Sequence, residues 1–189
     1  MEIDFVITWV DMNDSKWQHD FVKYSNKTKN EKNSVSKARF RDYGLLKFWF
    51  RGVEKFAPWV RKIHFVTCGQ KPEWLDENHP KINLVDHKNF IPEQFLPTYN
   101  SVVIERYLHK IPDLAEHFVY FNDDFYIINH LEKSRFFQNG LPCDISIFQY
   151  NPNWSQWYIR IKNNIRLINH HFQKKEVMRS FYDKWYNPI

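Results

Sequence analysis

Short hydrophobic runs alternate along the chain with longer segments in which hydrophobic residues recur at helical spacing. Four of the runs are rich in β-branched and aromatic residues, which is typical of strands buried on both faces. These strands are expected at residues 3–10, 62–68, 81–85 and 117–121. Helical spacing predicts helices at residues 41–56, 101–110 and about 154–185. Strands that alternate with helices predict an α/β fold with a mainly parallel sheet, flanking helices and a helical C-terminal third.

The polar segments between these elements predict loops and turns. Residues 14–37 are rich in Asn, Lys and Ser without a sustained period, which predicts a long mobile loop. This loop is either a solvated insertion or a basic lid over an anionic ligand. Asn139-Gly140 is typical of a tight turn, and one further strand is expected at 144–149. The pattern divides the chain into a core at 1–150 and a helical extension at 151–189.

Composition narrows the classes of function. Aromatic residues make up 19% of the chain, which supplies enough large apolar surface for a hydrophobic core. The chain has only four, widely spaced glycines, so both the glycine-rich phosphate loop and the dinucleotide fingerprint are absent. The net charge of +5 suits an anionic substrate, but it is too small and too scattered to indicate nucleic-acid binding.

The sequence also bears on the cellular compartment. Cys68 and Cys143 lie far apart, as expected of apolar fillers in a reducing environment rather than of a disulfide framework. No stretch approaches the roughly 18 apolar residues of a membrane span. Residues 1–10 lack the basic region of a signal peptide. We therefore expect a cytoplasmic protein without an integral membrane segment, either free or peripheral at the inner face of the membrane.

Polar residues follow the ends of the predicted strands, where ligands bind in open α/β sheets. The first strand leads into Asp11, Asn13 and Asp14, and the fourth into Asn122-Asp123-Asp124. Adjacent carboxylates are hard oxygen ligands, so Asp123 and Asp124 are candidates for binding magnesium or manganese. The alternative is a loop with helix-capping aspartates.

Other candidates lie near the predicted helix starts. Arg41 beside Asp42 is either a phosphate clamp or half of an exposed charge pair in a first helical turn. Asn100 and Ser101 are in a position to cap the second helix, and Glu105 one turn later faces either the site or solvent. His87 and His109 are more typical of structural histidines than of bases.

The chain contains an ordered series of characteristic strings. They are Asp4-Phe5-Val6-Ile7-Thr8-Trp9-Val10-Asp11, Arg39-Phe40-Arg41-Asp42, residues 54–63, Pro72-Glu73-Trp74-Leu75, Val85-Asp86-His87, Leu96-Pro97-Thr98-Tyr99-Asn100-Ser101 and Phe121-Asn122-Asp123-Asp124. Together they resemble the conserved regions of the Stealth family of sugar-phosphate transferases. This family includes bacterial capsular polysaccharide phosphotransferases and the animal N-acetylglucosamine phosphotransferase that tags lysosomal enzymes. The resemblance covers residues 3–11 and about 38–128, and residues 163–172 resemble the start of the third family region more weakly.

The resemblance implies a Rossmann-like core and transfer of a hexose phosphate from a nucleotide-diphosphate sugar to a sugar hydroxyl of a polysaccharide acceptor. The product is a phosphodiester in a capsular or cell-surface polysaccharide, and magnesium or manganese is the implied cofactor. By position, Asp11, Asp123 and Asp124 match the acidic site residues of the family, and Arg41 adds charge stabilisation. Substrate contacts are expected from Thr8, Trp9, Asn13, Asp42, Asn100, Ser101, Glu105 and Asn122.

Relatives in this family continue into later segments that carry a functional His and an Arg, whereas this sequence ends at Ile189. We therefore expect donor binding to exceed turnover, with Asp11 as the remaining candidate base. We also expect self-association through the C-terminal third, because its aromatic residues would otherwise be exposed. Two other functions fit the same residues: a metal-dependent glycosyltransferase, and a non-catalytic module or fragment that binds carbohydrate or nucleotide sugar.

Overall fold

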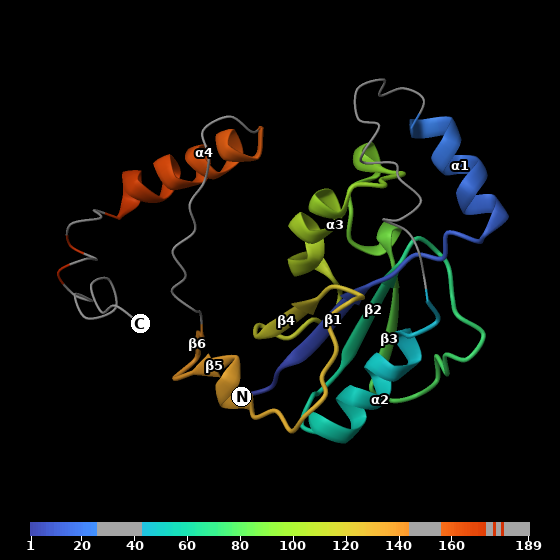
Figure 1. The fold of residues 1–189 in the computed structure, drawn as a ribbon, viewed down its shortest axis with the longest axis horizontal. Helices are drawn as coiled ribbons and strands as arrows, with labels where there is room; N and C mark the ends of the chain where they lie inside the picture. Colours follow the sequence, from blue (N-terminus) through green and yellow to red (C-terminus); the bar gives the residue numbers. More distant parts are fainter. Residues whose placement is uncertain (26–42, 144–155, 173–175, 177–178, 180–189) are drawn as a thin grey trace. The chain divides into compact units, whose positions relative to one another are not determined.

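A computed structural model describes residues 1–25, 43–143, 156–172, 176 and 179 (Figure 1). The chain divides into two compact units, Met1–Cys143 and Asp144–Ile189. The predicted strand at 144–149 lies outside the described residues.

The first unit is built on a four-stranded parallel sheet. Its strands are β1 (Asp4–Thr8), β2 (Ile63–Thr67), β3 (Ile82–Asp86) and β4 (Phe118–Phe121), in the spatial order β3-β2-β1-β4. In register, Phe5 of β1 lies between Ile63 of β2 and Val119 of β4. The predicted α/β fold with a mainly parallel sheet is therefore confirmed.

Helices cover the two faces of this sheet and produce two hydrophobic cores (Figure 1). On one face, Phe5, Phe65 and their strand neighbours pack against Trp49 and Val53 of α2 (Leu46–Phe56). On the other face, Val6 and its strand neighbours pack with residues of α3 (Ser101–Tyr107) and the following 3-10 helix η4 (Leu108–Lys110). Because successive strand residues point to opposite faces, uninterrupted hydrophobic strands are needed to fill both cores.

Two predictions for the chain between β1 and β2 need correction, one of a loop and one of a helix start. Residues 15–25 were expected to be part of a loop, but Ser15–Ser25 form the helix α1. Asp14 begins this helix, because its Oδ1 atom accepts hydrogen bonds from the backbone N–H groups of Lys16 and Trp17 at 2.8 and 3.1 Å. The rest of the predicted loop lies outside the described residues. The next helix begins at Leu46 rather than at residue 41, following Gly44 with its left-handed φ of 68°.

Short elements complete the first unit. They are the 3-10 helices η2 (His87–Asn89), η3 (Glu93–Phe95) and η5 (Lys133–Arg135), and the hairpin of β5 (Phe137–Gln138) with β6 (Leu141–Pro142). The hairpin turn has φ values of 52° at Asn139 and 77° at Gly140. Positive φ at both central residues is typical of a type I′ turn, so the turn predicted from Asn-Gly is confirmed.

A buried carboxylate organises the amino ends of the strands. Asp4 is fully buried, and Arg61 donates to it from Nε at 2.9 Å and from Nη2 at 2.6 Å. The backbone N–H groups of Lys62 and Ala115 donate to the same carboxylate, which also lies 2.9 Å from His64 Nε2. Burial raises the pKa of Asp4, but these donors outweigh it and hold the pKa below its ordinary value.

The second unit contains α4 (Gln156–His171), which agrees with the helix expected in the C-terminal third. Several of its hydrophobic side chains are exposed: Ile159, Ile165, Leu167 and Ile168, together with Phe172 just after the helix. Among the described residues, no helix has both the length and the apolar character needed to cross a bilayer.

Candidate functional site

The strand order reverses between β1 and β4, and we call the carboxyl edge of the sheet at this position the crevice. From β1 the chain continues to β2 and β3 on one side, and then crosses to β4 on the other side of β1. In parallel α/β sheets, ligands bind outside the strand ends where the order reverses in this way. The relevant ends here are Thr8 of β1 and Phe121 of β4.

Tyr120 joins the two strands at this crevice. Its hydroxyl lies 3.1 Å from Thr8 Oγ1, within hydrogen-bonding distance. Burial raises the pKa of Tyr120, the hydrogen bond to Thr8 opposes that effect, and the nearby carboxylates of Glu105 and Asp123 raise the pKa further. The Tyr120 hydroxyl of β4 therefore interacts with side chains from β1, from α3 and from the segment after β4. Thr8, Glu105 and Asp123 were expected at the site, whereas Tyr120 was not.

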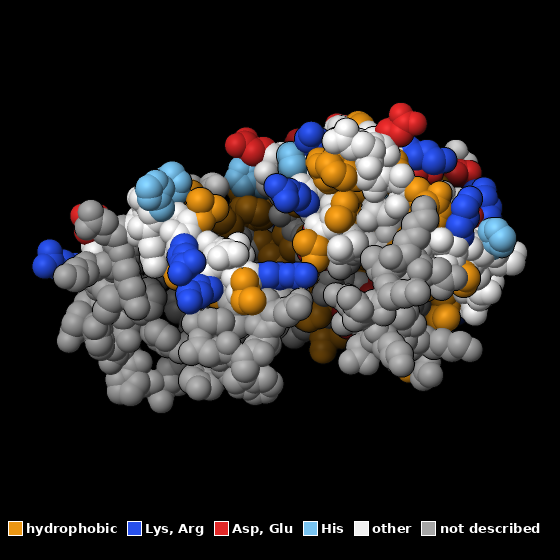
Figure 2. All heavy atoms as spheres, turned by 90° about the horizontal axis from the view of Figure 1, so that it is seen from above, with side chains coloured by type: hydrophobic (Ala, Val, Ile, Leu, Met, Phe, Trp, Pro, Cys, Tyr) orange, Lys and Arg blue, Asp and Glu red, His pale blue; other side chains and the backbone are white. Residues whose placement is uncertain are grey.

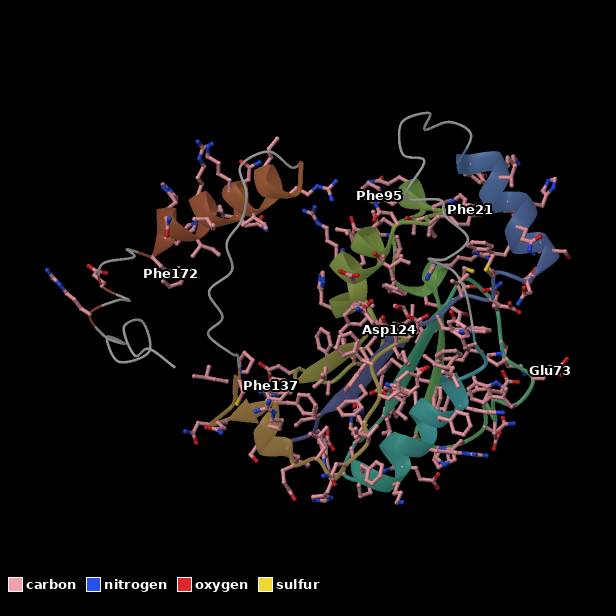
Figure 3. All side chains as sticks on the ribbon, in the orientation of Figure 1. Phe21, Glu73, Phe95, Asp124, Phe137 and Phe172 are labelled. Carbon is pink, nitrogen blue, oxygen red and sulfur yellow. The ribbon has the colours of Figure 1, made fainter. Side chains whose placement is uncertain are left out.

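The acidic pair lies in a turn directly after β4. Asn122, Asp123 and Asp124 are exposed, and the turn closes through a hydrogen bond from Phe125 N to Asn122 O at 3.2 Å. Figure 3 shows Asp124 on this segment. No helix begins there, so helix capping does not account for the two carboxylates.

The segment that follows the acidic pair is held against α2. Gly52 approaches it so closely that an added Cβ would lie 2.6 Å from the carbonyl oxygen of Ile127. Farther along, Leu131 N donates to Phe56 O at 3.0 Å, and Trp59 Nε1 donates to Leu131 O. The helix face that packs on the sheet core thus also fixes the backbone downstream of Asp123 and Asp124.

Gln70 fixes the loop after β1. Its side-chain amide accepts a hydrogen bond from Asp11 N at 2.9 Å and donates one to Asp11 O at the same distance. It also donates to Asp14 Oδ2 at 3.1 Å, and Thr67 Oγ1 donates to the Gln70 carbonyl at 2.8 Å. The hydrogen bond from Gln70 is the largest cause that lowers the pKa of Asp14. Gln70 follows the second strand, and the sequence alone does not show which loop its side chain will bind.

The other expected site residues have varied surroundings. Asp11 Oδ1 accepts from Asn13 N at 2.8 Å, which forms a local turn at the end of β1. Asn100 caps α3 by accepting from Val102 N at 3.0 Å, and Ser101 is the exposed first residue of that helix. Trp9 packs against Phe65, with ring centroids 5.8 Å apart. Arg41 and Asp42 lie outside the described residues.

A cavity of about 790 Å³ lies at the ends of β2 and β3, and we call it the β2–β3 cavity. Asp123 and Asp124 do not line it. Its lining residues come from α1, from the loops after β2 and β3 and from the segment before α3. They are Asp14, Lys16, Trp17, Asp20, Cys68, Gly69, Gln70, Asp86, His87, Lys88, Ile91, Glu93, Leu96, Pro97, Thr98 and Tyr99. The edge of the sheet therefore carries two neighbouring features, the acidic crevice at β1 and β4 and this cavity.

Charges of both signs are mixed on the described surface. On the face seen in Figure 2, Lys and Arg side chains lie interspersed with acidic and hydrophobic ones. The described residues contain no cluster of three or more His, Cys, Asp or Glu side chains suited to a metal ion. A magnesium ion that binds through one or two carboxylates and completes its shell with substrate phosphates and water does not need such a cluster. The oxygen donors of Asp123 and Asp124 fit that mode of binding.

Comparison with known proteins gives consistent matches. The family model described as Stealth protein CR2, conserved region 2, matches residues 39–144. The chain is 43% identical over 187 residues to the capsular polysaccharide phosphotransferase WcwK of Streptococcus pneumoniae, covering 98% of this chain and 56% of that protein. It is 40% identical over 188 residues to the capsular polysaccharide phosphotransferase CpsJ of Streptococcus thermophilus, covering 98% of this chain and 78% of that protein.

A third relative extends these matches to another genus. The chain is 42% identical over 187 residues to the exopolysaccharide phosphotransferase cps2G of Lactiplantibacillus plantarum, covering 98% of this chain and 54% of that protein. The chain thus spans little more than half the length of two of these three relatives. Gln70, Tyr120, Asp123 and Asp124 all lie within the range of the family model.

Proposed function

The chain belongs to the Stealth family, and on that basis we propose that it acts in the transfer of a hexose phosphate to a sugar hydroxyl. The donor is a nucleotide-diphosphate sugar, and the acceptor is a sugar hydroxyl of a growing capsular or other surface polysaccharide. The printed names of the relatives, capsular and exopolysaccharide phosphotransferases, support the reaction class.

One observation carries the proposal for the site. Two exposed carboxylates follow β4 in a turn that starts no helix, beside the crevice where the strand order reverses. Helix capping therefore does not account for an acidic pair in that position. The pair is well placed to act on a charged ligand in the crevice.

We propose that Asp123 and Asp124 hold magnesium or manganese together with the donor diphosphate. The ion would neutralise negative charge on the diphosphate when it is bound. Asn122 adds an amide oxygen beside the pair. Thr8 and Tyr120 present hydroxyl groups on the β1 side of the crevice, where they can donate hydrogen bonds to phosphate oxygens. Arg41 is proposed, from its family motif, to add positive charge.

The chemical step is an in-line displacement at the β-phosphorus of the donor. The acceptor oxygen forms a bond to that phosphorus, the bond to the bridging oxygen breaks, and the nucleoside monophosphate leaves with the electron pair. The proton of the acceptor hydroxyl must pass to a base. We propose Asp11, because only its Oδ1 is bound within the described residues and Gln70 fixes its backbone.

We also propose that this reaction takes place in the cytoplasm or at the inner face of the membrane. Cys68 and Cys143 are both unpaired, as expected in a reducing compartment.

Product analysis tests the proposed function. The full chain is incubated with magnesium, a neutral sugar acceptor and each of a panel of nucleotide sugars, and ³¹P NMR identifies the products. We expect a phosphodiester signal together with the nucleoside monophosphate. Release of the nucleoside diphosphate with a new glycosidic bond would instead show a glycosyltransferase. Donor binding by calorimetry without any turnover would show a binding module and refute the catalytic proposal for this chain.

A further inference from the structure

The β2–β3 cavity has the size of a ligand site and a composition that differs from that of the acidic crevice. Its volume of about 790 Å³ falls within the range usual for small-molecule pockets. It lies at the ends of β2 and β3, whereas the crevice lies at β1 and β4. Neighbouring strands are about 5 Å apart, so the two features are separated by about 10 Å. Two parts of one reaction complex could therefore occupy them together.

The charges around the cavity disfavour a phosphate ligand. Among the described residues, its lining contains four carboxylates, those of Asp14, Asp20, Asp86 and Glu93, and two lysines, Lys16 and Lys88. These groups leave a formal charge of −2, because His87 is neutral. A negative lining repels a diphosphate and favours a ligand without charge.

His87 supplies the clearest sign that a polar ligand belongs in the cavity. Its side chain lines the cavity with only 8% of the residue exposed, and its imidazole makes no hydrogen bond to any described residue. Burial lowers the pKa of His87 to about 4, so the ring is neutral and offers one donor and one acceptor. Among the described residues, Trp49 Nε1 is the only enclosed side-chain nitrogen or oxygen without a partner, so the ring nitrogens of His87 are open to solvent and can hydrogen-bond to a ligand with hydroxyl groups.

Asp86 stands next to His87 with a fixed orientation. Its Oδ1 accepts from Lys88 N at 3.0 Å, and its own backbone N–H donates to Asn89 Oδ1 at 2.9 Å. These bonds cap η2 and hold the carboxylate on the cavity wall. The other oxygen, Oδ2, lies 3.1 Å from the position of an added Cβ at Gly69, whose φ is 88°. The absence of a side chain there leaves space beside a carboxylate that can accept hydrogen bonds from hydroxyl groups.

Aromatic rings form another part of the wall. Trp17 of α1 and Tyr99 both line the cavity, with ring centroids 5.7 Å apart and an interplanar angle of 71°. Phe21 supports both rings, at 4.9 Å from Trp17 and 5.2 Å from Tyr99. Figure 3 shows Phe21 on α1. Rigid apolar faces combined with a few fixed polar groups are the usual lining of a pocket for an uncharged ligand.

We propose that the β2–β3 cavity binds the neutral ring of the acceptor sugar, with His87 and Asp86 hydrogen-bonded to its hydroxyl groups. This inference rests on the proposed function for the identity of the sugar as the acceptor. The cavity thereby separates an uncharged acceptor from the anionic donor, whose diphosphate belongs at the crevice beside Asp123. Trp17 and Tyr99 supply the apolar faces against which the ring packs.

The test measures binding rather than turnover. A panel of methyl glycosides of neutral hexoses and N-acetylhexosamines is titrated into the full chain, and the ring ¹⁵N signals of His87 are followed by NMR. Uridine, cytidine and their mono- and diphosphates are titrated in parallel. We expect at least one methyl glycoside, and none of the nucleosides or nucleotides, to shift the His87 signals. If no glycoside in the panel shifts them, or if a nucleoside or nucleotide does, the proposal is wrong.

Variants then separate binding from folding. His87→Phe keeps a ring of similar size and removes both hydrogen-bonding groups, so the melting temperature should stay the same or rise. Glycoside binding, followed by calorimetry, should weaken about tenfold, as expected for lost ligand hydrogen bonds in a buried site. Asp86→Asn retains an oxygen to cap η2 and should also weaken glycoside binding. The matched control is His109→Phe at an exposed residue of η4, which should bind glycosides normally.

The outcomes distinguish this proposal from the proposed function. Unchanged glycoside affinity in both His87→Phe and Asp86→Asn would overturn the cavity assignment, even if nucleotide sugars bind normally. Conversely, glycoside binding that depends on His87, in a chain that binds no nucleotide sugar, would support the cavity and count against the proposed donor reaction.

Discussion

Replacing Asp4 by Asn tests whether the buried carboxylate network holds the amino ends of the strands together. Five donor atoms surround this carboxylate, including Nε and Nη2 of Arg61 and His64 Nε2. In the variant, an amide nitrogen at the former Oδ2 position faces up to three donors. The neutral side chain also leaves Arg61 without a buried counter-charge. Breaking a buried ion pair by removing one partner costs about 3–5 kcal/mol. We expect a loss near the lower limit, because the remaining amide oxygen still accepts hydrogen bonds.

Urea denaturation followed by tryptophan fluorescence measures this loss as a shift in midpoint at constant slope. The matched control is Asp113→Asn, because the Asp113 carboxylate binds the same Arg61 but its side chain is 56% exposed. Exposed ion pairs contribute little, so the control should retain nearly full stability. If Asp4→Asn is no more destabilising than Asp113→Asn, the reasoning about the buried network is wrong.

The pH dependence gives a second test of the same network. The folded-state pKa of Asp4 is lowered, so its contribution is fully present above the unfolded value of about 3.9 and is lost as the pH falls through the folded pKa. The stability difference between the wild type and Asp4→Asn should therefore be constant near neutral pH and shrink below about pH 4. A difference that stays constant into that acidic range would contradict the assigned cause.

Four further predictions concern the site and the second unit. Replacing Asp123 and Asp124 by Asn should abolish magnesium-dependent donor binding in calorimetry without lowering the melting temperature, because both side chains are exposed; unchanged binding would reject the metal assignment. Gln70→Leu should cost about 1–3 kcal/mol in urea denaturation by leaving the Asp11 backbone unpaired, and a smaller loss would show that water replaces the amide. Gly52→Ala should also cost about 1–3 kcal/mol, since the new Cβ meets the carbonyl of the segment after the acidic pair; equal stability would show that this segment shifts easily. Ile168→Lys should reduce self-association in sedimentation velocity, because Ile168 is an exposed apolar residue of α4, and an unchanged distribution would exclude that surface.

Patterns that repeat along the chain predicted the sheet correctly. All four strands were expected from their hydrophobic runs. β1, β2 and β4 are shorter in the structure than the runs that predicted them, and β3 has the predicted length but begins and ends one residue later. These patterns do not predict the order of the strands in the sheet, because that order depends on which helix packs on which face. The helix α1 was missed for a related reason. Its aromatic residues Trp17 and Phe21 are few among polar neighbours, and they pack against Tyr99, which is remote in sequence.

The positions of the candidate site residues were predictable only where they follow directly from strand ends. The acidic pair after β4 and the polar loop after β1 were expected at the sheet edge, and both are there. Tyr120 was missed because a tyrosine within a hydrophobic strand is read as part of the core, and its hydroxyl contact with Thr8 requires the pairing of β1 with β4. The β2–β3 cavity was missed because its wall combines segments that only the folded chain brings together.

The paired hydrogen bonds between Gln70 and Asp11 resemble those that an adjacent strand would make. The side-chain amide accepts from the N–H and donates to the C=O of one residue, as a backbone peptide group does across a sheet. Although β1 ends at Thr8, its ladder is thereby continued by a single side chain. The amide proton of Asp11 should therefore exchange with solvent deuterium as slowly as those within the strand. Asp11, the proposed base, is then held in place without a ligand, so binding at this position would incur little loss of backbone entropy.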